Sequence, residues 1–201
     1  MFAETTTTGR FTPCPVLMTE RLLLRAPHEE DVPDLARLAN NQKIAGMLSR
    51  MPHPYAEADA RAFVARTNRL ADAGASGGAC VYALTLADTG AFLGCAGLEP
   101  RDHPEHELEL GYWIGEPYWN RGFATEAAHA LVDLAFRDRA TTVLHAACRV
   151  RNVASRRVIH KCGFQYVGQG MMDSLAAGRA PVERYCLTRK TWVGLRSWPQ
   201  A

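Results

Sequence analysis

The 201-residue sequence lacks the patterns that would place it at once in several large classes of protein. It has no apolar run near the roughly 18 residues that a membrane span requires. Its opening residues, MFAETTTTGRFTPCP, do not join a basic start to an apolar stretch, so we expect no signal peptide. It contains neither G-x-G-x-x-G after a strand nor G-x-x-x-x-G-K-S/T. A dinucleotide-binding fold and a P-loop are therefore poorly supported.

An excess of one charge is also missing. The formal net charge of +2 gives no global attraction to nucleic acid or to a membrane surface. Cysteines are present, but none are spaced as C-x-x-C, and most lie inside apolar segments. We interpret them as buried free thiols, which predicts a reducing, cytoplasmic location. The six cysteines are Cys14, Cys80, Cys95, Cys148, Cys162 and Cys186.

The length and the hydrophobic content of 47% suit one domain with a full core. Hydrophobic periodicity, glycines and prolines predict one α+β domain, a mixed sheet with helices on both faces. Strands are expected at 19–25, 80–87, 91–99, 106–115, 141–149, 164–168 and 182–188, and helices at 29–39, 43–48, 57–71, 122–139 and 153–162. We expect a flexible lead-in at 1–17, the domain at 18–192 and a tail at 193–201.

The most informative stretch is GYWIGEPYWNRGFATEA at 111–127. It reads as a strand, a glycine-bearing turn and an alanine-rich helix. Such a turn directs free backbone N–H groups and the positive end of the helix dipole at one spot, which favours a phosphate ester. The alternative is a purely structural corner in which Gly122 supplies a tight bend.

Six motifs follow one another along the chain. They are TERLLLR at 19–25, PYAEADA at 54–60 with Phe63, ELELGYWIG at 107–115, WNRGFATEA at 119–127, RNVAS at 151–155 with KCGF at 161–164, and LTRKTW at 187–192. In this order they resemble the GCN5-related N-acetyltransferase (GNAT) superfamily, and in particular its RimJ/RimL-type branch. Trp119 stands where the superfamily commonly has Gln or Arg, and an aromatic residue there is frequent in this branch.

The resemblance implies a GNAT fold, with a mostly antiparallel sheet of about seven strands, the last ending within LTRKTW, and acetyl-CoA as cosubstrate. The pyrophosphate would lie on the N–H groups of about 121–125, and the amide-rich pantetheine arm along the backbone of 113–115. The residues implied to bind the cofactor are Trp113, Ile114, Asn120, Arg121, Gly122, Phe123, Ala124, Thr125, Asn152, Ser155 and Arg157.

Amine acetylation needs a base, an oxyanion donor and a proton source for the leaving thiolate. The resemblance assigns the base to Glu109, with Glu107 on the same strand face as its rival, and the proton source to Ser155. Asn152 binds the pantetheine arm in the family, but it is also a good helix N-cap. The backbone N–H of Ile114 or a neighbour is the expected oxyanion donor.

The acceptor amine is expected to be a protein N-terminus or a small molecule, and segments around 43–55 and 175–181 are expected to shape its site. A non-catalytic acyl-CoA-binding or sensing protein is the alternative. His103 and His106 suit a polar turn better than a metal site, so no metal is expected. The basic run from Arg149 to Lys161 alternates with apolar residues, which favours a packed helix over a nucleic-acid surface. The chain is expected to be a monomer or homodimer.

Overall fold

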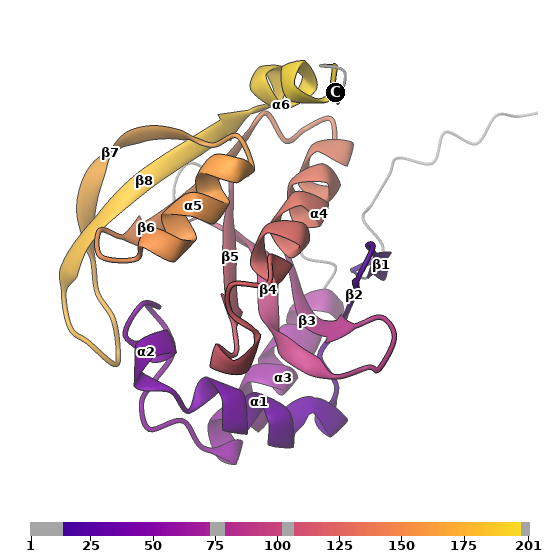
Figure 1. The fold of residues 1–201 in the computed structure, drawn as a ribbon, viewed down its shortest axis with the longest axis vertical. Helices are drawn as coiled ribbons and strands as arrows, with labels where there is room; N and C mark the ends of the chain where they lie inside the picture. The colour runs from indigo at the N-terminus through magenta and orange to yellow at the C-terminus, as the bar shows by residue number, and fades with distance from the viewer. Residues whose placement is uncertain (1–13, 73–78, 102–106, 198–201) are drawn as a thin grey trace, which may run out of the picture.

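The computed structural model describes residues 14–72, 79–101 and 107–197. Eight strands form one sheet in the order β1-β2-β3-β4-β5-β6-β8-β7, and all neighbours are antiparallel except β5 and β6 (Figure 1). The strands are β1 Leu17–Met18, β2 Leu22–Arg25, β3 Cys80–Leu86, β4 Phe92–Pro100, β5 Leu108–Ile114, β6 Val143–Arg149, β7 Gln165–Met172 and β8 Ala180–Thr188.

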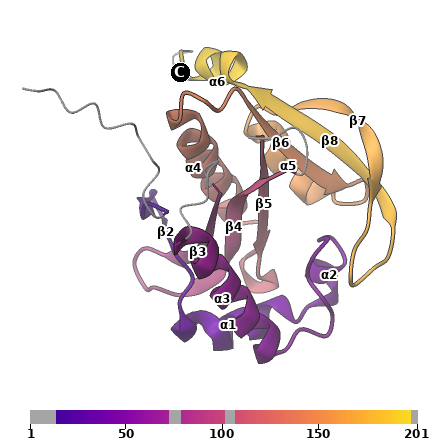
Figure 2. The same cartoon turned by 180° about the vertical axis from the view of Figure 1, so that it is seen from behind.

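Helices cover both faces of this sheet. α4 and α5 pack on one face, and α1 and α3 pack on the other, as the two opposite views show (Figures 1 and 2). The helices are α1 Val32–Ala39, α2 Gln42–Ala45, α3 Glu57–Asp72, α4 Phe123–Arg137, α5 Val153–Lys161 and α6 Arg189–Ser197, with short 3-10 turns η1 Glu29–Asp31 and η2 Glu116–Tyr118.

The alternation of side chains along β5 decides which groups face which layer. Leu108, Leu110 and Ile114 are buried in the core cluster under α4. Trp113 packs instead in the second cluster, beneath α1 and α3. Glu109 therefore projects on the α1 and α3 face, away from α4.

The parallel pairing of β5 with β6 is very short. Leu108 lies opposite Leu144 and Glu109 opposite His145, and no further pair between these strands exists in the part of the chain described. β6 continues alongside β8 as far as Arg149, while β5 continues alongside β4. Beyond Glu109, the edge of β5 that faces β6 is therefore open.

The predicted mixed, mostly antiparallel sheet is confirmed, and each predicted helix and strand has a counterpart. The sheet has eight strands rather than about seven, because the two residues of β1 pair with β2. The last strand ends within LTRKTW as expected, because β8 ends at Thr188, but the helix α6 that begins at Arg189 was not expected. The Trp192 ring stacks on Phe136 of α4 at 5.2 Å between centroids, which favours a helix there. The boundary expected at residue 192 falls inside α6.

The six cysteines all lie within the described residues and remain free thiols, four of them buried. This agrees with the expectation of unpaired, largely buried thiols. Among residues 14–72, 79–101 and 107–197, no helix is both long and apolar enough to span a bilayer. Of the expected lead-in, residues 1–13 lie outside the described chain.

Candidate active site

The turn between β5 and α4 is held in an unusual backbone conformation. Asn120 has a φ of 60° and Gly122 a φ of 82°, both in the left-handed region, which asparagine and glycine tolerate better than other residues. The Trp119 indole Nε1 donates a hydrogen bond of 2.6 Å to the Ile114 carbonyl. The aromatic residue at this place therefore ties the turn to the end of β5, a contact that the sequence alone did not predict.

The N-terminus of α4 presents free hydrogen-bond donors. The first backbone bond of this helix runs from the Glu126 N–H to the Gly122 carbonyl at 3.1 Å, and no side chain caps the helix. Within the described chain, the N–H groups of residues 121–125 donate to no protein atom. Five successive free donors at the positive end of a helix form a site suited to an anion.

The open edge of β5 presents further backbone groups. The Gly115 N–H donates to the Leu93 carbonyl of β4 at 2.7 Å, so Gly115 faces its paired neighbour. By the alternation of an antiparallel strand, Ile114 directs its N–H and carbonyl to the opposite, unpaired side. Trp119 occupies that carbonyl. The Ile114 N–H is therefore the group at this edge that is left to serve a ligand.

Two hydroxyl groups meet across the α4 and α5 face. The Tyr112 hydroxyl lies 3.0 Å from Ser155 Oγ and 3.2 Å from the Ser155 carbonyl. Burial raises the pKa of Tyr112, so its hydroxyl stays protonated. The Asn152 Oδ1 accepts the Ser155 N–H at 3.1 Å, which makes Asn152 the N-cap of α5. Sequence reasoning named Ser155 but missed Tyr112, although its place in the motif was a signal.

The two rival carboxylates on the α1 and α3 face have different surroundings. The Glu107 Oε2 lies 2.7 Å from His145 Nε2 and accepts a 3.1 Å hydrogen bond from Arg101. The Glu109 side chain is 42% exposed, and its nearest cation, Arg101 Nε, lies 3.7 Å away. Partial burial raises the pKa of Glu109, although Arg101 and two more distant arginines oppose this shift. Glu107 is already engaged by two partners, and Glu109 is the freer proton acceptor.

The two segments expected to shape an acceptor site are in contact. Ser174 Oγ donates to the Leu48 carbonyl at 2.6 Å, and the Leu175 N–H donates to the Ser49 carbonyl at 3.0 Å. The turn of the β7–β8 hairpin thus lies against the chain that follows α2 (Figure 1). The buried Arg149 of β6 donates to the carbonyl of Gly178 in the same hairpin turn at 3.2 Å, so this side of the site carries positive charge.

Three arginines of the basic run bond to groups of the protein itself. Arg151 donates to the Gly46 carbonyl, Arg156 pairs with Glu183 and Arg149 is 3% exposed. Arg157 lies exposed on α5. This distribution agrees with the expected packed helix.

In the described part of the chain, no three or more His, Cys, Asp or Glu side chains are grouped so that they could hold a metal ion. His103 and His106, the residues considered for a metal, lie outside the described residues.

The residues present fit a long ligand that carries a phosphate at one end and amides along its length. The free N–H groups of 121–125 suit the phosphate, and the open edge at Ile114 suits an amide. Glu109 lies on β5. Ser155 lies on α5, next to Tyr112 of β5, on the opposite face of the sheet. Coenzyme A has this combination of pyrophosphate and amides.

Comparison with known proteins identifies the family to which the chain belongs. The model of the Acetyltransferase (GNAT) domain matches residues 21–165. The chain therefore belongs to the GNAT family of acetyltransferases. A curated relative, the uncharacterised N-acetyltransferase p20 of Bacillus licheniformis, is 26% identical over 179 residues, which is 89% of this chain and 98% of the relative.

Solved structures share the fold. RimL, a ribosomal alpha-N-protein acetyltransferase in complex with coenzyme A, matches with a TM-score of 0.69 and 23% identity, covering 86% of this chain and 97% of that one. RimJ of Mycobacterium smegmatis, in complex with CoA-disulfide, matches with a TM-score of 0.73 and 17% identity, covering 90% and 85%. At these identities the likeness shows a common fold.

Proposed function

We propose that the protein transfers the acetyl group of acetyl-CoA to a primary amine, directly and within one ternary complex. The observation that carries the proposal is the row of five free N–H groups at the start of α4, beside the open edge of β5. A helix N-terminus that bound no anion would gain stability from a side-chain cap, and α4 has none. Acetyl-CoA, when bound, supplies an activated acetyl thioester.

The chain's own groups hold that cosubstrate. The N–H groups of 121–125 bind the pyrophosphate, and Asn120 and Gly122 keep the turn in the conformation that exposes them. The Ile114 N–H pairs with the pantetheine arm or with the developing oxyanion. The Asn152 side-chain oxygen caps α5, and its NH₂ group donates to the pantetheine arm. Arg157 is the proposed partner of the 3′-phosphate.

Proton transfer is assigned to two residues on opposite faces of the sheet. Glu109 accepts a proton from the acceptor ammonium, directly or through water, because an α-amine with a pKa near 8 is mostly protonated at pH 7. Ser155 donates a proton to the leaving sulfur. Tyr112, held neutral by its burial, keeps the Ser155 hydroxyl oriented.

The acceptor is proposed to be a protein N-terminus or a small amine. Its site lies on the α1 and α3 face, where the contact between residues 174–175 and 48–49 closes one side. Turnover of acetyl-CoA against a panel of amines and N-terminal peptides tests the proposal. Binding of acetyl-CoA with no turnover on any acceptor would favour the alternative, an acyl-CoA-binding or sensing protein. A cytoplasmic location remains a prediction from the free cysteines.

Acetyl-CoA should stabilise the folded chain against heat. At a concentration 100-fold above its Kd, a ligand adds about 2.7 kcal/mol to the free energy of unfolding. For a domain of this size that corresponds to a rise in Tm of about 5–10 °C. Differential scanning fluorimetry with and without acetyl-CoA measures the rise. An unchanged Tm at millimolar acetyl-CoA, together with no heat of binding in calorimetry, would contradict the proposal.

Tyr112→Phe should slow turnover by about three- to tenfold and leave the Kd for coenzyme A unchanged, because it removes one hydrogen bond to Ser155. Steady-state kinetics at saturating acetyl-CoA measure the loss. If Tyr112 acts through Ser155, the variant that also carries Ser155→Ala should be no slower than Ser155→Ala alone. Additive losses would show that the tyrosine acts independently of the serine.

A further inference from the structure

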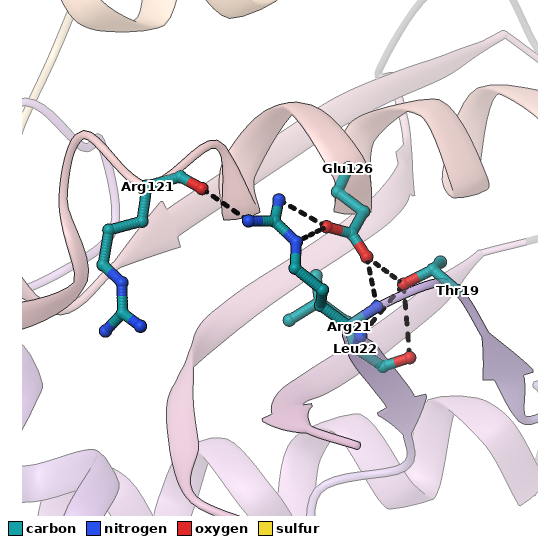
Figure 3. Close-up of polar contacts among 5 residues, drawn as sticks. All are labelled: Thr19, Arg21, Leu22, Arg121 and Glu126. Atoms are coloured by element: carbon teal, nitrogen blue, oxygen red, sulfur yellow. Dashed lines mark hydrogen bonds and ion pairs between the residues drawn. The ribbon is translucent and has the colours of Figure 1, made fainter. Parts of the chain in front are cut away.

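Arg21 lies just before β2, 100 residues from the anion-binding turn in the chain, yet it contacts both sides of that turn. Its Nη1 donates to the Arg121 carbonyl at 2.9 Å, and its Nε donates to Glu126 at 2.7 Å. Figure 3 shows the guanidinium group between these two partners. We propose that Arg21 is a positioning residue for the pyrophosphate of coenzyme A. This inference rests on the proposed function.

The contact with the carbonyl sets the direction of a neighbouring donor. The Arg121 carbonyl and the Gly122 N–H belong to one planar trans peptide, in which they point in opposite directions. Because Arg21 holds the carbonyl on the β2 side, the Gly122 N–H is turned away from β2, toward the free donors of the turn. Gly122 follows this peptide with a φ of 82°, and glycine restricts rotation about its own backbone least, so the Arg21 contact limits rotation of the peptide plane.

The contact with Glu126 offsets a negative charge that would be unfavourable at this helix end. A carboxylate in the first turn of α4 would repel a phosphate at the same helix end. Its oxygens instead accept from Thr19 Oγ1 at 2.6 Å, from the Arg21 N–H at 2.8 Å and from the Arg21 guanidinium (Figure 3). Partial burial acts to raise the pKa of Glu126, but these donors outweigh it and hold the pKa below its usual value, so the carboxylate is ionised and paired.

The same guanidinium is fixed in place from the helix side. Arg21 Cζ lies 4.8 Å from the centroid of the Phe123 ring, and the Phe123 side chain is buried. A Cβ at Gly122 would lie 3.3 Å from Arg21 Nη2. Arg21, Phe123 and Glu126 thus form one unit that keeps the turn closed against β2. Arg21, between β1 and β2, therefore supports the cofactor site without touching the cofactor.

The test compares three ligands by isothermal titration calorimetry: coenzyme A, dephospho-coenzyme A, and pantetheine, which lacks the pyrophosphate. We expect Arg21→Gln to weaken coenzyme A and dephospho-coenzyme A equally, by about tenfold or more, and to leave the affinity for pantetheine unchanged. Arg37→Gln is the matched control, because Arg37 is an exposed arginine paired with Asp34 on α1. It should change none of the three affinities.

The outcomes distinguish a failure of the positioning role of Arg21 from a failure of the proposed acetyltransferase function. Unchanged coenzyme A binding by Arg21→Gln, or an equal loss for coenzyme A and pantetheine, would overturn the positioning role while the function stands. A wild-type protein that binds none of the three ligands would overturn both. If Arg21→Gln does not fold, Arg21→Lys decides. Lysine keeps the charge but has no planar fork to join Glu126 and the Arg121 carbonyl, so the same selective loss is expected.

Discussion

Gly122→Val should weaken acetyl-CoA binding by about 100-fold or more. The valine Cβ would lie 3.3 Å from Arg21 Nη2, which holds this turn, and a β-branched residue resists the left-handed φ of 82°. Loss of one or two charge-assisted hydrogen bonds, each contributing about 1.5–3 kcal/mol, accounts for the size of the effect. Isothermal titration calorimetry with acetyl-CoA measures it.

The matched control for this substitution is Gly90→Val. Gly90 lies in the β3–β4 turn with a φ of 73°, and a Cβ there would meet no atom within 4 Å. Both variants should lose about 1–3 kcal/mol of stability from backbone strain, but only Gly122→Val should lose affinity. If Gly122→Val bound acetyl-CoA as the wild type does, the turn would be a structural corner and its role as a phosphate site would be withdrawn.

Glu109→Gln should lower the turnover rate by about 10²–10⁴-fold, the usual loss when a general base is removed. The amide keeps the size of the side chain, so the Kd for coenzyme A should not change. The loss should shrink as the pH rises, because more of the amine then arrives without its proton. In the wild type, burial raises the pKa of Glu109. The acidic limb of its pH–rate profile should therefore lie above the usual glutamate range, since activity falls as this carboxylate gains a proton.

Glu107→Gln tests the rival carboxylate, which lies just before β5. Glu107 is held by Arg101 and lies against His145, so its replacement should affect turnover much less. A normal pH–rate profile for Glu109→Gln, with Glu107→Gln impaired, would move the base to Glu107. Normal rates for both variants on a confirmed amine would show that no carboxylate of this strand is needed.

Local patterns predicted the elements that carry the site. The strand, glycine turn and alanine-rich helix of 111–127 appear as β5, the turn and α4. The face of Glu109 followed from its apolar neighbours Leu108 and Leu110, because alternation in a strand is a local property. The N-cap role of Asn152, left open beside a role in binding, is also present in the structure.

Contacts between distant segments were not predictable in the same way. No periodicity connects Arg21 with Glu126, 105 residues later, or Tyr112 with Ser155, 43 residues later. Both pairs depend on how the sheet brings strands and helices together. The helix at Arg189–Ser197 was missed for a related reason, since it follows the predicted strand end and packs its Trp192 on Phe136 of α4, far away in the sequence.

The two-residue pairing of β5 with β6 divides the sheet into two blocks of strands. β1 to β5 form one block and β6 to β8 the other, and within residues 14–72, 79–101 and 107–197 only Leu108–Leu144 and Glu109–His145 pair between them. An amide-bearing ligand at the open edge of β5 would act as a wedge-shaped ninth strand along this seam. Its binding energy would therefore couple the two blocks mechanically. When such a ligand binds, amide hydrogen exchange should slow in β6 as well as in β5, although the two strands belong to different blocks.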